Sequence, residues 1–538
     1  MRKKRDSDGK KGSLTIFAAI SFLLIAELLF TLAEGVRQTE LVRIAEMNTD
    51  AVTEAVLAEY CIPLWDKYQL LGYEASEDSE NESSGLGLSA MTNEMTALSD
   101  MNFAVEKRYS ILSQYNLLRL GVETASVTDY TLMTDDGGKA FVSAVSSYMS
   151  ANLLYEEGKL AFSEAEQLYN SSRATESMTE NSKFSLKAVS AAISAIEKAA
   201  ESSGASEDSG TTASESSTST IPVPESAKKA KGETLTARRR SSDAEETLKK
   251  TDSSSGGFLL SAILPSESTL SSNAITLSET VSGRTLLSGS GVGEDPGWSD
   301  KVYLEQYLLT RFSCFTDNKS DQVLNYELEY LIAGKNTDQA NLKTVAAELL
   351  AIREAANLAY LASSTSKQEL LEAFAETVSA VTVNPAIGEV VKAGLMAAWA
   401  YAESLMDLRA LLAGKKIPAI KSDETWSASL ENLVAILNGN AQAKESSSGI
   451  SYKSYLGILL FMGSQTKEAM RAMDLIELTI RREDGYAAFR MDQLILEADV
   501  SITYYWKPLF LSFVSMLRTK AGVFSIQKTK QISYLKGS

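Results

Sequence analysis

The sequence contains no histidine among its 538 residues. Histidine is the most common general base, metal ligand and near-neutral pH switch in proteins. Its absence excludes Ser-His-Asp and Cys-His catalysis and zinc sites of the HExxH type. We therefore expect a non-catalytic protein with no cofactor and no metal site.

Cysteine, proline and glycine are also scarce. The two cysteines, Cys61 and Cys314, have neither a CxxC motif nor zinc-site spacing. They form either one disulfide, if this part of the chain faces an oxidising compartment, or two separate buried thiols, because sequence spacing does not fix their proximity. Only 8 prolines and 31 glycines interrupt the chain, which favours long helices.

The net charge of −18 is unevenly distributed. Residues 1–12 carry six basic and two acidic side chains, which gives +4 and leaves −22 for the rest. A domain this acidic repels nucleic acid and anionic lipid headgroups. We therefore expect no nucleic-acid partner.

An apolar run, LTIFAAISFLLIAELLFTLA, extends from Leu14 to Ala33 with Glu27 as its one charge. Its length of roughly 30 Å as a helix matches the hydrocarbon core of a bilayer. The preceding basic residues predict a cytoplasmic N-terminus and an extracellular remainder, in a single-pass cell-membrane protein. The alternative is a cleaved signal peptide, which usually has a shorter apolar region and a better AxA-like site.

Glu27 is unusual because a carboxylate within a bilayer costs on the order of 3 kcal/mol. It is expected to be neutral or paired. The functional interpretation is a contact with another membrane helix during assembly, and the alternative is a tolerated acid near the outer interface. Beyond the span, apolar residues from Leu41 to Val56 keep helical spacing as far as Pro63, which predicts a long stalk helix.

The rest of the chain is predicted to be mainly α with a small antiparallel β-sheet, an α+β fold. Residues 75–90 are typical of a loop. The domains are predicted as a leader (1–12), a transmembrane helix (13–35), a stalk and helical bundle (36–200), a disordered Ser/Thr-rich insert (201–300) and an α+β domain (301–538). Helices are predicted at 91–127, 139–200, 339–363, 366–381, 386–412, 423–438 and 452–482, and strands at 326–330, 498–506 and 524–534.

Motifs for chemistry are weak. Phosphate-binding glycine loops and the GxSxG elbow are missing from the sequence. Acidic pairs such as Glu327 with Glu329 or Asp423 with Glu424 are expected to be solvated carboxylates, not a glycosidase pair. The DDGG sequence at 135–138 lacks the alternating oxygen ligands of a calcium loop and is typical of a turn. An SxxK match at 364–367 is expected by chance in a serine-rich chain.

The N-terminal segment KKGSLTIFAAISFLLIAELLFTLAEGVR resembles TadE/TadG-like pseudopilins of tight-adherence pilus systems. The resemblance implies processing between Gly12 and Ser13, and an acid at position 22 of the mature helix, which is Glu34. Together with the position of Glu27 in the span, this predicts Glu27 and Glu34 as assembly contacts in the membrane helix. The sequence departs from the pilin pattern at position 5, where Phe17 replaces the usual glutamate.

A second resemblance covers the C-terminal half, in VLNYELEYLIAGKNTDQANLKTVAAELLAIREAANLAYL, LLAGKKIPAIKSDETW and ISYKSYLGILLFM. These segments resemble a family of uncharacterised membrane-anchored proteins from Gram-positive, Firmicute-type bacteria. The family carries a domain of unknown function, so no catalytic residues come with it.

The resulting hypothesis is a component of a tight-adherence-type pilus or related surface assembly. Its expected partners are the lipid bilayer and other membrane-anchored pilus or envelope proteins. The alternative is an envelope scaffold or adhesin that never enters a filament. A histidine-free, carboxylate-dependent glycan hydrolase is a third hypothesis, and it needs two acids facing each other across a cleft.

Overall fold

The computed structural model describes residues 6–75, 86–103, 119–151, 263–264, 270–291, 295–319, 322–382, 385–430, 433, 436, 441–447, 449–509 and 523–535. The chain forms two compact units that do not follow its order. The first unit comprises Met1–Asn152, Thr280–Asp300 and Ile476–Ser538, and the second comprises Leu153–Glu279 and Lys301–Leu475. The insert predicted at 201–300 and the helix predicted beyond residue 151 lie largely outside the described residues.

The first unit begins with helix α1 (Asp6–Leu57), which has three glycines and no proline. The predicted stalk therefore exists, but it ends at Leu57 and not at Pro63. The Cys61 N–H donates to Gly72 O over 3.0 Å, so the chain turns to pair with the segment before the first strand. Pro63 lies in the first turn of α2 (Ile62–Tyr68), where a missing N–H leaves no helix bond unmade.

The same unit contains a four-stranded antiparallel sheet with β3 at its centre. Its strands are β1 (Tyr73–Glu74), β2 (Leu120–Leu132), β3 (Leu494–Trp506) and β4 (Phe524–Ser533). β3 pairs with each of the other three. The predicted strands at 498–506 and 524–534 are confirmed. The helix predicted over 91–127 agrees with α3 (Leu88–Phe103) and is wrong from residue 120, where β2 begins; residues 104–118 lie outside the described residues.

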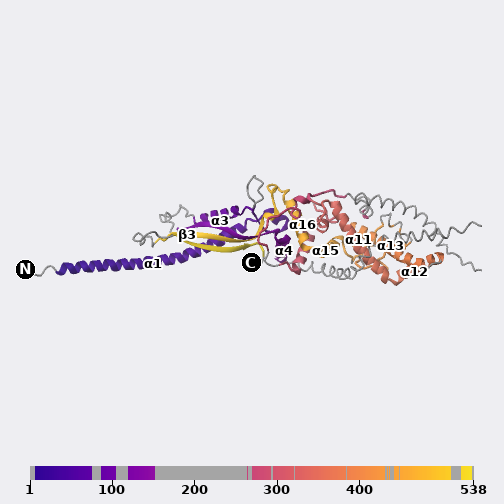
Figure 1. The fold of residues 1–538 in the computed structure, drawn as a ribbon, viewed down its shortest axis with the longest axis horizontal. Helices are drawn as coiled ribbons and strands as arrows, with labels where there is room; N and C mark the ends of the chain where they lie inside the picture. Colours follow the sequence, from indigo (N-terminus) through magenta and orange to yellow (C-terminus); the bar gives the residue numbers. More distant parts are fainter. Residues whose placement is uncertain are drawn as a thin grey trace, which may run out of the picture. The chain divides into compact units, whose positions relative to one another are not determined.

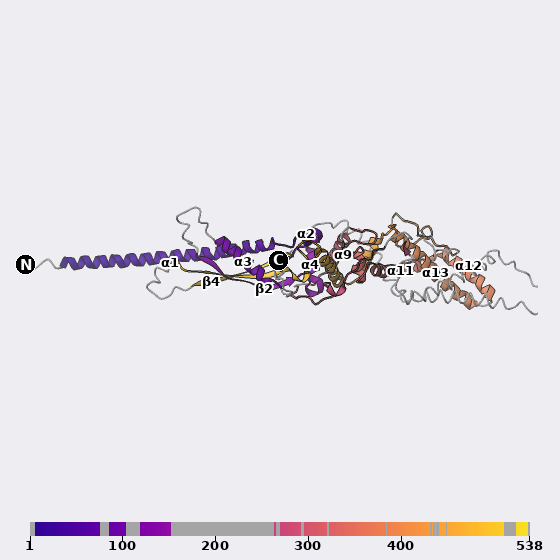
Figure 2. The same cartoon turned by 90° about the horizontal axis from the view of Figure 1, so that it is seen from above.

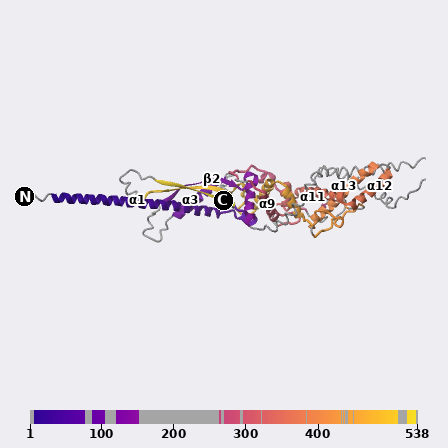
Figure 3. The ribbon, with the colours of Figure 1, turned by 90° about the horizontal axis from the view of Figure 1, so that it is seen from below.

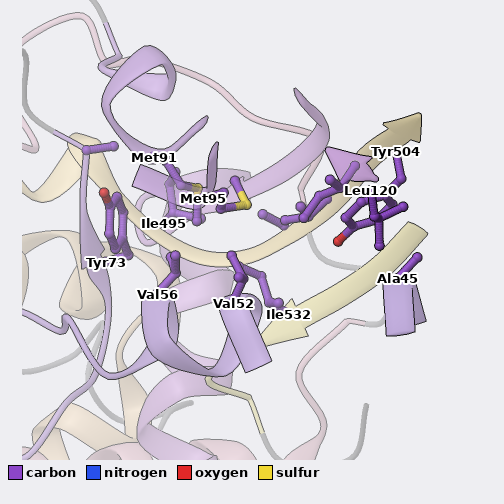
Figure 4. Packing of buried hydrophobic residues seen from close by; sticks show 14 of the residues in the cluster. Ala45, Val52, Val56, Tyr73, Met91, Met95, Leu120, Ile495, Tyr504 and Ile532 are labelled. Atoms are coloured by element: carbon purple, nitrogen blue, oxygen red, sulfur yellow. The ribbon is translucent and has the colours of Figure 1, made fainter. Parts of the chain in front are cut away.

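The core of this unit lies between the sheet and the two helices α1 and α3 (Figures 1 and 2). Val52 and Val56 of α1 and Met91 and Met95 of α3 are buried against β3, where Figure 4 shows them around Ile495. β2 is rich in β-branched residues, which suit a half-buried pleated surface. Helix α4 (Asp135–Ala151) follows β2, and the short 3-10 helix η4 (Met491–Gln493) precedes β3.

The second unit is helical in its described residues. Its elements are η2 (Leu277–Glu279), α9 (Trp298–Arg311, which begins in the first unit), α10 (Glu327–Ala333), α11 (Asp338–Ser363), α12 (Thr365–Thr382), α13 (Pro385–Leu412), α15 (Tyr452–Met462) and α16 (Gln465–Ile480, which ends in the first unit). Figure 3 shows α11, α12 and α13 packed side by side. The helices predicted at 339–363, 366–381 and 386–412 are confirmed.

Three local predictions in this region are wrong. Residues 326–330 form the start of α10 and not a strand, because both Glu327 and Glu329 point into the protein and bond backbone N–H groups. Residues 423–429 form a turn and irregular chain, so no helix begins at residue 423. The helix predicted over 452–482 is interrupted between α15 and α16, where Gly463 ends the first helix.

Candidate functional site

The most distinctive feature of the described residues is the apolar half of α1. From Leu14 onward this helix is long and apolar enough to cross a bilayer, and it is the one such helix among the described residues. Large side chains including Phe17, Phe22, Leu28 and Leu32 are each more than half exposed. A water-soluble surface rarely exposes so continuous an apolar band, whereas a bilayer covers it at no cost.

Glu27 lies on this apolar half with an exposed side chain. Its backbone carbonyl accepts a hydrogen bond from Thr31 Oγ1 over 2.8 Å. Its carboxylate has no hydrogen bond or ion pair with any other described residue. A carboxyl group on the surface of a bilayer-spanning helix therefore has to find its partner outside this chain or among the residues not described.

Glu34, the residue directly after the apolar run, is in a different environment. It is only 1% exposed, and its Oε1 lies 2.6 Å from Arg37 Nη1. The Leu509 N–H donates to Glu34 Oε2 over 3.0 Å, and Arg37 Nη2 donates to Lys507 O over 3.2 Å. We call these four residues the exit clamp. The clamp joins the chain just after β3 to α1 at the point where the apolar run ends.

Beyond the clamp, α1 is locked to the sheet by buried polar contacts. Tyr504 of β3 shares hydrogen bonds with Asn48 Nδ2 at 3.0 Å and with Thr49 Oγ1 at 2.9 Å. Asn48 Nδ2 also donates to Ser99 Oγ of α3 over 2.9 Å. Burial raises the pKa of the Tyr504 hydroxyl, which therefore stays neutral and able to donate. These bonds fix the rotation of α1 on the sheet.

Ion pairs reinforce the same contact at the surface. Lys530 Nζ of β4 lies 2.8 Å from Asp50 Oδ1, and Lys528 Nζ lies 3.7 Å from Glu46 Oε1. Each exposed pair contributes at most about 1 kcal/mol, so the register depends chiefly on the buried contacts. The apolar run therefore belongs to the same continuous helix that packs against the sheet.

The predicted processing site, Gly12 and Ser13, lies within α1. Of the two arrangements that the sequence left open for Cys61 and Cys314, the structure has two separate buried thiols. Burial raises the pKa of the Cys61 thiol to about 12 and also raises that of Cys314, which makes both weak nucleophiles.

The two acidic pairs that were expected to be solvated differ: Asp423 and Glu424 are exposed, whereas that expectation is wrong for Glu327 and Glu329, which are buried. Glu327 Oε2 accepts from the Ser313 N–H at 2.8 Å and from its hydroxyl at 2.9 Å. Glu329 Oε1 accepts from the Phe315 N–H and the Tyr452 hydroxyl at 2.9 and 2.8 Å. Burial raises the pKa of each carboxyl to about 7. Both residues therefore organise the chain at 313–315.

The DDGG segment is a turn, as its sequence predicts. Asp136, Gly137 and Gly138 all have positive φ, and the Asp135 carboxylate accepts from the backbone N–H groups of Leu132 and Gly289 at 2.8 and 2.9 Å. These bonds use oxygens that a calcium ion would need. No grouping of three or more potential metal ligands exists among the described residues.

A buried and balanced charge cluster lies in the second unit. Arg353 Nη2 lies 2.9 Å from Asp407 Oδ2, and Lys421 Nζ lies 2.6 Å from Glu403 Oε1 and 2.7 Å from Asp407 Oδ1. Two cations thus meet two anions, and all four side chains are almost fully buried. Removing one member would leave an uncompensated buried charge, so this cluster is structural.

Residues 238–506 match a protein family described as a family of unknown function (DUF5702). The chain belongs to this family. No curated protein and no solved structure matches it. The DUF5702 region ends at Trp506, the last residue of β3, and does not include α1. The matched region therefore covers the second unit from residue 238 onward and the central strand of the first unit, while the anchor and the exit clamp lie outside it.

Sequence reasoning identified Glu27 and Glu34 but not the partners of Glu34. Arg37 could have been found from its spacing, because residues three apart face each other on a helix. No local spacing in the sequence identifies Lys507 and Leu509 as partners, since Leu509 is 475 residues away from Glu34.

Proposed function

We propose that this DUF5702 protein is a membrane-anchored, extracytoplasmic and non-catalytic component of a tight-adherence-type pilus or a related surface assembly. One observation carries the proposal. An exposed apolar helix with an exposed acid, Glu27, continues without a break into the core of a folded unit. Such a helix couples what happens in the membrane to the position of the folded unit, because no hinge separates the two.

The presence of Glu27 favours lateral assembly with another membrane helix over a role as an anchor alone. An anchor needs only apolar residues, and a carboxylate at this depth weakens insertion by about 3 kcal/mol. A neighbouring membrane helix that offers a hydrogen-bond donor or a cation would offset this loss. Glu34 is bound within the chain, so we assign the intermolecular contact to Glu27. The TadE-like features of the leader, Gly12 and Ser13 among them, agree with this proposal.

The test is photo-crosslinking in native membranes, with a photoreactive amino acid in place of Ile25. We expect covalent adducts with other membrane-embedded proteins in the wild-type background. Glu27→Leu should abolish these adducts, whereas Ser21→Leu, an equally apolar change in the same span, should keep them. Adducts that persist in Glu27→Leu, or a chain recovered only as an uncrosslinked monomer, would refute the assembly contact.

A second candidate function is an envelope scaffold or adhesin outside any filament, which Phe17 at position 5 of the expected mature helix favours. Immunogold labelling distinguishes the two. Gold particles along filaments support the pilus component, and labelling confined to the cell body supports the scaffold. N-terminal sequencing adds an independent measurement, because a mature chain beginning at Ser13 indicates prepilin-type processing.

A further inference from the structure

The exit clamp brings one end of the sheet to the end of the apolar run. Glu34 follows Ala33 directly, and it holds the Leu509 N–H at 3.0 Å. Leu509 is three residues after the end of β3. Trp506 pairs with Phe524, the first residue of β4, so the clamp places the beginning of β4 at the same level. If α1 spans a bilayer, this end of the sheet lies at the membrane surface.

Apolar exposure on the strands is concentrated at this end. Val523 is 58% exposed, Phe524 42% and Tyr505 37%. The exposed positions farther along β4 are polar: Ser525, Gln527, Thr529 and Gln531. Single exposed apolar residues are ordinary on soluble proteins. Here three of them lie at the end of the sheet that is nearest the apolar run, while the exposed positions elsewhere on the strand are polar. This distribution indicates a surface that is not in bulk water.

The charge of this region is opposite to that of the chain as a whole. Residues 500–538 contain no Asp or Glu and six Lys or Arg, in a chain with a net charge of −18. Lys528 and Lys530 are paired with acids of α1, whereas Lys507 is exposed at the membrane-side end. A basic side chain beside exposed aromatic rings matches the composition that proteins present to lipid headgroups.

We propose that the end of the sheet formed by Tyr505, Lys507, Val523 and Phe524 is a second membrane contact. It inserts into the interfacial layer of the bilayer that surrounds α1, with lipid as its partner. This inference rests on the membrane anchor of the proposed function but not on the assembly contact. Two points of attachment restrict the tilt of α1 and hold the first unit in one orientation on the membrane.

The test uses the full-length protein in vesicles of phosphatidylcholine and phosphatidylglycerol. A single cysteine is introduced as Val523→Cys or Gln531→Cys and labelled with nitrobenzoxadiazole. Both positions are exposed and lie about 27 Å apart along one strand, so Gln531 is the matched control. The wild-type chain controls for labelling of Cys61 and Cys314, which are buried. A third label at Phe22→Cys reports the anchor itself.

We expect lipids with a spin label near the headgroup to quench the label at 523 at least threefold more strongly than the label at 531. Equal quenching at 523 and 531, with the label at Phe22 still quenched by deep spin labels, overturns the second contact and leaves the anchor in place. Blue-shifted emission at 523 without lipid quenching, increasing with protein density, identifies a neighbouring copy as the partner and also overturns it. An unquenched label at Phe22 refutes the anchor and this inference together.

Discussion

Replacing Glu305 by glutamine tests how strongly burial of an acid limits the stability of the second unit. Glu305 lies on α9 and is 9% exposed, and its Oε2 has no hydrogen-bond partner among the described residues. Burial, and then repulsion from Glu468, raise the pKa of its carboxyl to about 8, while Lys301 lowers it. Its Oε1 packs closely against Gly457 of α15, where a Cβ atom would come within 3.0 Å of it.

The direction of the effect follows from proton binding. The folded state holds the Glu305 proton more tightly than the unfolded state, so stability is fully present below the unfolded pKa of 4.5 and is lost as the pH rises to about 8. A shift of this size corresponds to about 5 kcal/mol at 1.4 kcal/mol per pH unit. Glutamine has the same shape and no charge. We therefore expect Glu305→Gln to gain about 4 kcal/mol over wild type between pH 5 and pH 9.

The assay is calorimetric unfolding of both proteins across this pH range in the same detergent. For a unit of this size, the expected gain corresponds to a rise of about 10 °C in the Tm of the second unit at pH 9 relative to wild type. Glu369→Gln is the control, because Glu369 is exposed on α12 and should change the Tm little at any pH. Parallel pH profiles for wild type and Glu305→Gln would refute the reasoning, since they would mean that Glu305 ionises at its ordinary pKa in the folded protein.

Three further predictions concern the first unit. Glu34→Ala should weaken the exit clamp by about 2 kcal/mol and speed hydrogen exchange at the Leu509 amide, because the carboxylate that accepts from this amide is removed. Glu40→Ala removes an exposed acid of the same helix and should leave this exchange rate unchanged. If the Leu509 amide exchanges at the same rate in Glu34→Ala as in wild type, the clamp is not formed. Val52→Ala should lower the unfolding free energy by about 2 kcal/mol, because Val52 is 1% exposed, whereas Val36→Ala at 67% exposure should cost less than about 0.5 kcal/mol; similar losses at both positions would contradict the packing of α1 on the sheet. Cys61 should react with a thiol reagent at pH 8 at least about 100-fold more slowly in the folded chain than in urea, because burial raises its pKa to about 12; comparable rates would show that the thiol is accessible.

Local signals in the sequence were sufficient for the long elements. The apolar run from Leu14 to Ala33 is continuous, so its helical and exposed character does not depend on any distant residue. Helices α11, α12 and α13 extend over several turns, and repeated apolar spacing over that length is hard to mistake for a strand. The two strands near the C-terminus were recognised from their β-branched and aromatic residues.

The predictions for short segments were wrong because the residues that these segments bond are not their neighbours in the local sequence pattern. Residues 326–330 alternate between apolar and acidic side chains as a strand does. However, Glu327 and Glu329 are buried and accept hydrogen bonds from the backbone N–H groups of residues 313 and 315, so the alternation does not reflect two faces of a sheet. The first part of β2, residues 120–127, has the pattern of a helix in the sequence, and its strand pairing depends on β3, which lies more than 360 residues farther along the chain. A sequence of five to thirteen residues does not show which distant strand will cover it.

The sequence alone determined that the chain has an exposed apolar helix with an acid in it, a histidine-free composition and a mainly helical second half. Only the tertiary structure decided that the two C-terminal strands belong with α1 and not with the helices that precede them. It also decided that Glu34 is bound within the chain while Glu27 is exposed. The physical reason is that burial and hydrogen bonding of these carboxylates depend on residues such as Leu509, which come close only when the whole chain has folded.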